Sequence, residues 1–270
     1  MAEMEYQDIL FAVTGRVALL TLNQPQIRNP MGGKRTTEEL VHALTRTQED
    51  EGISALVITG AGSAFSAGGN LRELRDRAHD ASLTPIKIME FYRRATHRMT
   101  RALANLDVPT IAAVNGLALG GGMDLATMCD IRLASTEAFF GETFLNLGSI
   151  PGTGGSWFLE QAVGHMHAMR MTAMAEPIGA EEALAIGLVA RVLPPDQLLP
   201  EAMALAQRIA AKPPRTLRLA KRLLRQSLSM NMGDFLDTCA AAQALAQTSG
   251  DHKEAVNAFF EKRDPVFDGN

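Results

Sequence analysis

The sequence contains no apolar run that approaches the roughly 18 residues needed for a membrane-spanning helix. Its opening residues, MAEMEYQDIL, are acidic, and they lack the basic segment followed by an apolar one that is typical of a signal peptide. We therefore expect a cytoplasmic protein that is not inserted in a membrane.

The chain also contains only two cysteines and has no excess of positive charge. The two cysteines, Cys129 and Cys239, each lie in an apolar helical pattern, which is typical of reduced thiols in the core of a cytosolic protein. The formal net charge is −4, which argues against nucleic acid as the main partner. A local basic patch for a phosphorylated ligand remains compatible with this charge.

Several common cofactor and catalytic motifs are absent. Neither a G-x-x-x-x-G-K-[ST] phosphate loop nor a G-x-S-x-G nucleophile motif occurs. Gly60 and Gly62 follow a predicted strand, as in a dinucleotide fingerprint, but Phe65 stands at the third glycine position, where a helix must pack closely. His165 and His167 are two residues apart and would point to different faces of a helix, so they make a poor metal pair.

The chain instead shows an alternation of strand and helix patterns. Predicted strands cover residues 9–13, 17–22, 53–58, 110–114, 131–134 and 187–193, the first two forming a hairpin with its turn at Gly15. Predicted helices cover 33–49, 85–106 and 153–186, with another beginning near 71. Thr36 and Glu39 have the spacing of a capping box. This alternation predicts a parallel α/β core with right-handed crossovers over residues 1–195, followed by a helical region over 196–270.

The stretch from Thr110 to Asp130, TIAAVNGLALGGGMDLATMCD, predicts a buried strand, a flexible turn and the start of a helix that carries Asp124. Three consecutive glycines, 120–122, let backbone amides approach a ligand without an intervening Cβ. A helix N-terminus there favours an anion or a polarised carbonyl oxygen. A tight turn without a ligand is equally compatible with these residues alone.

A second loop of small residues, Ser66 to Gly69, follows another predicted strand. Loops at the carboxyl ends of parallel strands converge on one crevice, which is the usual ligand position. Two backbone amides from two such loops would form an oxyanion hole, which suits any reaction that places negative charge on a carbonyl oxygen.

Four segments together carry a resemblance to a known family. They are FSAGGNLREL (65–74), PTIAAVNGLALGGGMDLATMCDIRLAS (109–135), FGETFLNLGSIPGTGG (140–155) and EAVNAFFEKRDPVF (254–267). With this spacing, from about residue 8 to residue 267, the chain resembles the crotonase superfamily, the enoyl-CoA hydratase/isomerase group. The resemblance implies a ββα-superhelix core with a helical C-terminal region that trimerises, often as a dimer of trimers. It also implies an acyl-CoA thioester as substrate and no metal or redox cofactor.

The resemblance places the oxyanion hole on the backbone N–H groups of Ala67 and Gly121, which would hold the thioester oxygen as an enolate develops. Gly68, Gly69 and Asn70 continue the first loop and are implied to contact the substrate.

Three further residues are implied to contact the CoA moiety. Arg28 precedes the first helix, and Phe259 and Lys262 from the C-terminal helix would reach the nucleotide end of CoA, including that of a neighbouring subunit. The residues alone are equally compatible with Arg28 as a solvated loop charge, Phe259 as a core side chain and Lys262 as a surface charge.

The acids depart from the family pattern. By this resemblance, typical hydratases of the family have two glutamates that bind one water between them. The matching positions here are Asp124 and Phe144. A further acid position used by some isomerases holds Gly152. Glu142 lies two residues before Phe144 and places a carboxylate nearby if that segment is extended; otherwise it is a capping or surface acid. Phe144 would also make the pocket drier, raising the pKa of a nearby carboxyl group.

Asp124 is therefore the expected general acid/base, and Glu142 a second candidate. Three functions stay open at this point. The resemblance favours enoyl-CoA hydration, whereas a single carboxylate suits double-bond isomerisation, since one base can also return the proton. An acyl-CoA binder without catalysis is the third.

Overall fold

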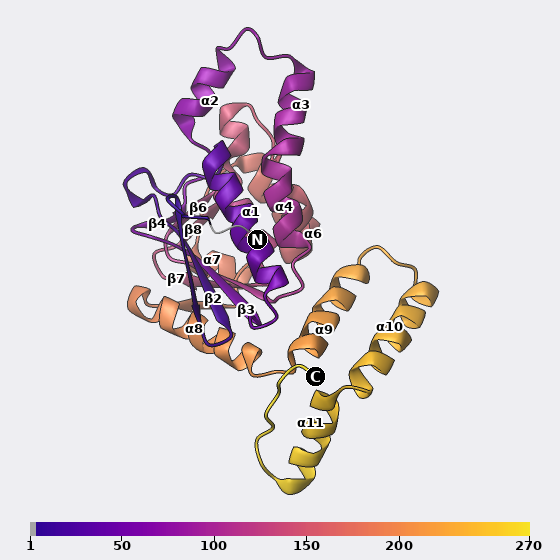
Figure 1. Cartoon of the computed structure of the whole chain (residues 1–270). Helices are drawn as coiled ribbons and strands as arrows, with labels where there is room; N and C mark the ends of the chain where they lie inside the picture. The colour runs from indigo at the N-terminus through magenta and orange to yellow at the C-terminus, as the bar shows by residue number, and fades with distance from the viewer. Residues whose placement is uncertain (1–3) are drawn as a thin grey trace.

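The computed structural model describes residues 4–270, and the first three residues of the acidic N-terminal stretch lie outside the described part. Its centre is a six-stranded sheet with the order β1-β2-β3-β5-β7-β10 (Figure 1). The strands are β1 (Ile9–Thr14), β2 (Val17–Leu22), β3 (Ala55–Gly60), β5 (Thr110–Val114), β7 (Ile131–Ser135) and β10 (Arg191–Leu193). β1 and β2 form the predicted hairpin, and all other neighbours are parallel, as predicted.

Four shorter strands form a second sheet with the order β4-β6-β8-β9, which the sequence did not predict. They are β4 (Ala64–Ser66), β6 (Leu117–Leu119), β8 (Phe139–Gly141) and β9 (Ile178–Gly179). Segments this short contain too few residues for a period-2 pattern to be visible. Because β4, β6 and β8 are mutually parallel, the loops that follow them meet at one edge of this sheet.

Residues 4–270 contain eleven helices. They are α1 (Lys34–Glu49), α2 (Leu71–Ala78), α3 (Pro85–Arg94), α4 (Thr96–Ala104), α5 (Gly121–Met128), α6 (Gly155–Met174), α7 (Ala180–Ala185), α8 (Pro195–Ala210), α9 (Pro214–Gln226), α10 (Met232–Gln247) and α11 (Gly250–Glu261), with 3₁₀ turns η1 (Pro25–Ile27) and η2 (Thr143–Leu147).

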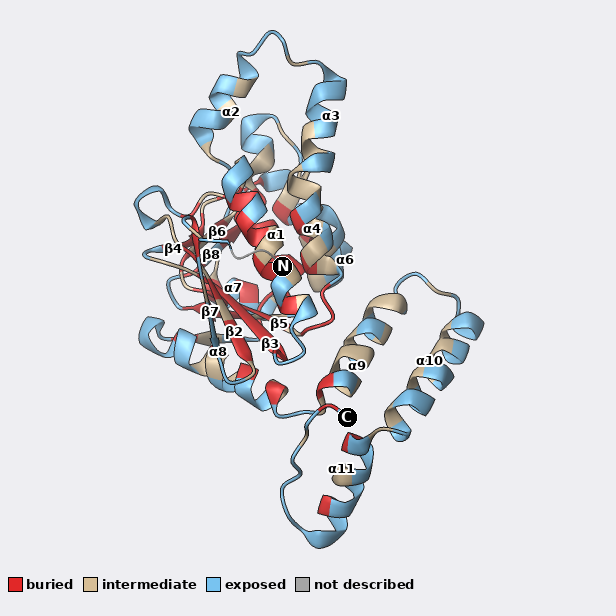
Figure 2. Cartoon of the chain, in the orientation of Figure 1, coloured by how far each residue is buried: buried red, intermediate tan, exposed pale blue. Residues whose placement is uncertain are grey.

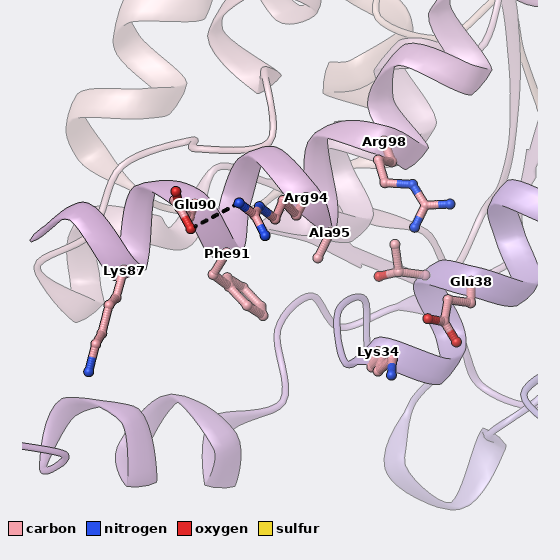
Figure 3. A pocket seen from close by; sticks show the side chains of 9 residues that line it. Lys34, Glu38, Lys87, Glu90, Phe91, Arg94, Ala95 and Arg98 are labelled. Carbon is pink, nitrogen blue, oxygen red and sulfur yellow. Dashed lines mark ion pairs between the residues drawn. The ribbon is translucent and has the colours of Figure 1, made fainter. Parts of the chain in front are cut away.

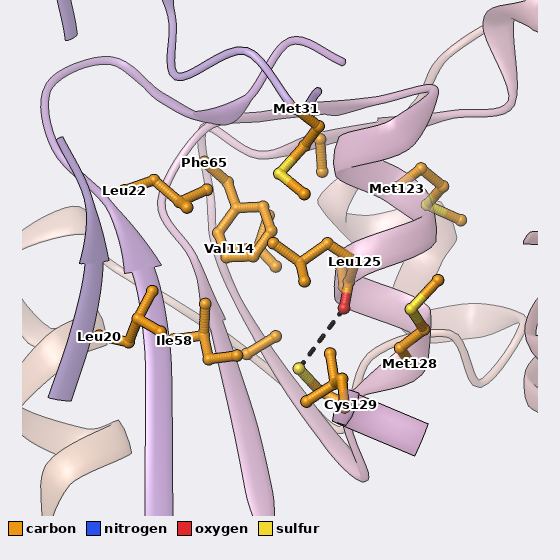
Figure 4. Close-up of a cluster of buried hydrophobic side chains, with 14 of the residues drawn as sticks. Leu20, Leu22, Met31, Ile58, Phe65, Val114, Met123, Leu125, Met128 and Cys129 are labelled. Carbon is orange, nitrogen blue, oxygen red and sulfur yellow. Dashed lines mark hydrogen bonds between the residues drawn. The ribbon is translucent and has the colours of Figure 1, made fainter. Parts of the chain in front are cut away.

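The six-stranded sheet is buried on both faces. On β3, Leu56 and Ile58 pack in one cluster with side chains from α1, α4 and α5, part of which is seen in Figure 4. Val57, between them in sequence, points to the other face and packs against Leu198 and Ala202 of α8. A continuous apolar strand is what a parallel sheet covered by helices on both sides requires.

Two helix predictions and one strand prediction need correction. Residues 85–106 form two helices, because Ala95 leaves the helical conformation (φ −111°, ψ −90°). Residues 153–186 are interrupted by β9, between α6 and α7. The expected strand over 187–193 begins only at Arg191, since the amides of Leu188 and Val189 turn back to the carbonyl of Ala183.

The prediction of a capping box at Thr36 and Glu39 is wrong. α1 begins after Gly33 without a side-chain cap, and the Thr36 hydroxyl donates to Asp8 at 2.7 Å. The Glu39 carboxylate accepts the backbone amides of Asp8 and Ile9 at 2.8 and 3.2 Å. These two side chains therefore tie α1 to the first strand instead of closing the end of the helix.

The two cysteines differ in their surroundings. Cys129 is buried, and burial raises the pKa of its thiol to about 12, so it is an unreactive core side chain as expected. Cys239 is only half-buried, on α10, a helix with no buried residue. Both are free thiols.

The C-terminal helices divide into two groups. α8 packs on the sheet, whereas α9, α10 and α11 extend away from it; α9 is mostly half-buried, and α10 and α11 are largely exposed (Figures 1 and 2). We therefore propose that the region standing apart from the core begins with α9, after the boundary of 195 expected from the sequence. The division of the chain into two domains stays a prediction.

One buried carboxylate holds α9 to the core. Asp107, in the turn before β5, lies 2.5 Å from Arg222 Nη2 and 3.0 Å from Arg225 Nη2. Burial alone would raise the pKa of Asp107, but hydrogen bonds from Arg222, Gln48 and Arg225 outweigh it and the pKa is lowered. Lys221 adds an ion pair with Asp130 at 2.6 Å.

Asp107→Asn should lower the free energy of unfolding at pH 7 by about 1–3 kcal/mol, since it removes a buried charge that two guanidinium groups bond. The folded pKa is lowered, so this stabilisation exists above the unfolded pKa of about 4 and disappears as the pH falls below it. Denaturant titrations at pH 7 and pH 3 measure both effects.

Glu51→Gln is the matched control. Its carboxylate lies 3.8 Å from Arg215 with both side chains exposed, so the expected change is within about 0.5 kcal/mol. Equal effects of the two substitutions would show that Asp107 does not anchor α9.

Candidate active site

Asp124 lies in the first turn of α5, a helix whose eight residues are all buried. The sequence GGMDLATM allows this, because small residues bring the helix backbone close to its neighbours. The amide of Asp124 donates to the carbonyl of Gly120 at 2.9 Å, which places its side chain one turn beyond the glycines. Its relative exposure is 0%, so this carboxyl is enclosed by the protein.

Glu142 is brought to the same place from a different strand. It follows β8 directly and precedes η2, and it is also 0% exposed. A Cβ added at Gly155 would lie 1.8 Å from Asp124 Oδ1 and 3.1 Å from Glu142 Oε1. Both carboxyls therefore occupy the space beside the Gly155 backbone, and only glycine fits at the start of α6.

The two carboxyls have no charge partner. Within residues 4–270 no other residue donates a hydrogen bond to any of their four oxygens, so the two carboxyls interact only with each other. Burial, followed by the charge of Glu142 and a hydrogen bond to it, raises the pKa of Asp124 well above its ordinary value. Burial raises the pKa of Glu142 to about 7, although the hydrogen bond with Asp124 acts in the opposite direction. Both pKa values are raised by the same burial, so the pair favours holding a proton between the two carboxyls at a pH where an exposed acid is ionised.

The two loops rich in small residues, 66–69 and 120–122, lie against each other. Gly68 has φ 88°, and a Cβ there would lie 2.5 Å from the Leu119 carbonyl and 3.4 Å from the amide nitrogen of Gly121. Only glycine permits this close approach. Gly121 is the first residue of α5, so its N–H has no partner within the helix.

The structure contradicts Ala67 as the second free amide. Its N–H donates to the carbonyl of Arg28 at 2.9 Å and is therefore not available to a ligand. Met31 pairs with the same loop in a parallel bridge at Gly69, donating to the carbonyl of Gly68 at 2.7 Å. In such a bridge the N–H of Gly69 points away from Met31, and it donates to no acceptor in the described chain.

The other predicted residues of this region have distinct positions. Asn70 caps α2, its side chain accepting the amide of Arg72 at 3.0 Å. Phe144 is half-buried and borders the glycine turn, 3.6 Å from the position of a Cβ on Gly120. Gly152 lies against the ring of Tyr92 and carries no acid.

Arg28 lies next to the site, and the two C-terminal residues do not. The Arg28 carbonyl meets Ala67, while its side chain is exposed and pairs with no carboxylate in residues 4–270. Phe259 is 79% exposed, so it is not a core side chain, and Lys262 is exposed after the end of α11. Figure 1 shows α11 at the end of the molecule away from β4 and β6, so neither residue reaches the carboxyl pair of its own chain.

A cavity of about 400 Å³ lies between the start of α1 and the helices α3 and α4 (Figure 3). Phe91 and Ala95 provide its apolar wall, and Lys34, Lys87 and Arg98 are among the charged residues around it. Asp124 and Glu142 do not line this cavity, so the enclosed carboxyl pair is a separate feature.

No group of three or more His, Cys, Asp or Glu residues within 4–270 has the arrangement of a metal site. In the same residues no helix is both long and apolar enough to cross a membrane.

Comparisons with known proteins agree on one family. The chain matches the enoyl-CoA hydratase/isomerase family over residues 13–270. It is 37% identical over 264 residues to a probable enoyl-CoA hydratase of Mycobacterium tuberculosis, covering 98% of this chain and 99% of that protein. It is also 37% identical to the 2,3-dehydroadipyl-CoA hydratase of Escherichia coli, covering 97% and 99%. A crystal structure of a putative enoyl-CoA hydratase from Streptomyces coelicolor superposes with a TM-score of 0.93 at 30% identity, covering 100% and 97%.

The buried carboxyl pair should destabilise the fold as the pH rises. Because the folded pKa of Glu142 is raised, the free energy of unfolding falls as the pH rises from the unfolded pKa of about 4.3 to the folded value of about 7. Glu142→Gln should therefore be more stable than the wild type by about 1–3 kcal/mol at pH 8, and by less at pH 5. Denaturant titrations at the two pH values test this. If the wild type is as stable as Glu142→Gln at pH 8, or more stable, the Glu142 carboxyl is not buried without a charge partner.

Proposed function

Because the chain belongs to the enoyl-CoA hydratase/isomerase family, we propose that it adds water to a 2-enoyl-CoA thioester using Asp124 and Glu142. The observation that carries this proposal is the enclosure of both carboxyls beside Gly155 without a cation or a hydrogen-bond donor. Two carboxyls in one dry site can divide the roles of acid and base, which one carboxyl cannot do at the same moment.

The thioester oxygen is held by two backbone amides. The N–H groups of Gly69 and Gly121 are supported for this role, because each lacks a protein acceptor and the loops that carry them lie against each other at Gly68. Two fixed donors stabilise the negative charge that develops on this oxygen when a nucleophile adds to the double bond. They replace the pair Ala67 and Gly121 expected from the sequence.

The two carboxyls share the proton transfers. We assign the base to Glu142, which removes a proton from water as the oxygen bonds to C3 of the enoyl group, and the acid to Asp124, which lies one turn beyond the Gly121 amide. The electrons of the double bond move to form an enolate, and Asp124 gives its proton to C2. Glu142 then returns a proton to the neighbouring Asp124, which restores the starting state.

The two alternative functions lose their main support. Isomerisation by a single base was favoured because only Asp124 was assured, and Glu142 now supplies a second buried carboxyl. A binding protein without catalysis has no use for two unpaired buried carboxyls, which lower stability. No cofactor beyond the CoA thioester itself is needed for the proposed steps, and we place the reaction in the cytoplasm.

Asp124→Asn and Glu142→Gln should each lower kcat for hydration of crotonyl-CoA by at least about 100-fold, since an amide keeps the shape but transfers no proton. Loss of the enoyl absorbance measures the rate. Glu137→Gln, an exposed acid between β7 and β8, is the matched control and should retain the wild-type rate.

The same assays with 3-enoyl-CoA separate the alternatives. A wild type that only moves the double bond would establish isomerisation, and tight binding without turnover of either thioester would establish the non-catalytic binder. Wild-type hydration by Glu142→Gln would remove Glu142 from the mechanism.

We further propose that the chain assembles as a trimer or a dimer of trimers through α9, α10 and α11. α10 has no buried residue in the single chain, and Leu236 and Leu245 on it are 58% and 65% exposed. In such an assembly Phe259 and Lys262 of one subunit would contact the CoA of a neighbour, and Arg28 the CoA of its own chain.

Lys262→Ala should raise KM for the acyl-CoA about threefold to tenfold and leave kcat unchanged, because the lost contact is with the nucleotide and not with the reacting carbons. Steady-state kinetics measure both constants. Lys253→Ala, an exposed charge on the same helix, serves as the control. Equal KM values for both variants would remove Lys262 from the CoA site.

A further inference from the structure

Six buried side-chain polar atoms within residues 4–270 have no hydrogen-bond partner. They are Asp124 Oδ1 and Oδ2, Glu142 Oε1 and Oε2, Thr153 Oγ1 and His167 Nδ1. The carboxyl oxygens belong to the proposed proton carriers. Thr153 lies two residues before Gly155, against which both carboxyls pack. A buried hydroxyl without a partner is costly, and one so close in the chain to the carboxyl pair points to a polar ligand.

The backbone that carries Thr153 is fixed by α4. The ring of His97 contacts the Gly152 carbonyl through Nε2 at 2.9 Å, and the Thr100 hydroxyl donates to the Thr153 carbonyl at 2.9 Å. On the other side, Gly155 lies against the carboxyl pair. The Thr153 carbonyl is thus occupied and its position set, while its hydroxyl remains unused.

The spacing allows one water to join these groups. Two peptide units separate Thr153 from Gly155, so their Cα atoms lie at most about 7.6 Å apart. A water that bonds at about 2.8 Å on each side spans roughly 5.6 Å between its partners. Since the carboxyls are in contact with Gly155, a single water is long enough to connect a carboxylate oxygen with Thr153 Oγ1 when this hydroxyl is turned toward Gly155.

We propose that Thr153 Oγ1 binds the water that adds to the enoyl double bond; this inference rests on the proposed hydration. One hydrogen of the water bonds to Glu142, which takes it as a proton, and the other bonds to Thr153 Oγ1. With both hydrogens directed, a lone pair of the water oxygen points at C3 of the substrate. Thr153 neither gains nor loses a proton, so it is a residue that contacts the nucleophile and orients it.

The test compares two reactions of the same site. Hydration of crotonyl-CoA needs the oriented water, whereas uptake of deuterium from D₂O at C2 of butyryl-CoA needs only the amides and a carboxyl. Thr153→Val, which keeps the side-chain shape, should lower kcat for hydration about tenfold or more and change the exchange rate less than about twofold. Thr153→Ser retains the hydroxyl and should restore most of the hydration rate.

The melting temperature distinguishes a structural role of Thr153 from a role in binding the water. Thr153→Val removes a hydroxyl that bonds nothing in the protein, so Tm should stay the same or rise. Wild-type hydration by Thr153→Val, or equal loss of both reactions together with a lower Tm, would overturn the proposal. A wild type that exchanges deuterium but does not hydrate would overturn the proposed function, and the role of Thr153 with it.

Discussion

The enclosure of two carboxyl groups side by side, without a cation, is the constraint on which the site depends. It requires a glycine at position 155, because a Cβ would occupy the place of Asp124 Oδ1. It also raises the pKa of both acids, since neither a guanidinium nor an ammonium group stabilises their ionised forms. The extensive core beneath the site offsets the cost of this arrangement. The site that we propose for the chemistry is therefore one that costs the fold stability when the carboxyls ionise.

The second sheet is what makes this enclosure geometrically attainable. β4, β6 and β8 contain three residues each, yet their parallel pairing places the amide of Gly69, the start of α5 and Glu142 at one edge. The six-stranded sheet below acts mainly as a support, covered by α8 on one face and by α1, α4 and α5 on the other. The groups that we propose for the reaction thus come from three segments that follow three different strands.

The periphery is built differently from this centre. α9 is joined to the core by charged groups around Asp107, while α10 and α11 leave many apolar side chains exposed. Such exposure on helices that pack on little of their own chain supports an assembly in which neighbouring subunits cover them. The loop that precedes Gly155 is held by His97 and Thr100, so α4 fixes the backbone next to the carboxyl pair.

Local pattern was sufficient for much of the fold. Continuous apolar runs predicted β3 and β5, the turn at Gly15 predicted the hairpin, and the glycines predicted a helix start beside Asp124, because these depend on neighbouring residues. The family resemblance also predicted a site at the two glycine loops, and the structure brings these loops together at Gly68. The tertiary structure decided the rest: whether Glu142 faces Asp124, which amide is already bonded, and where α8 packs. Ala67 and Glu142 could not be judged from the sequence, since their partners, Arg28 and Asp124, meet them only through strand pairing and long-range packing.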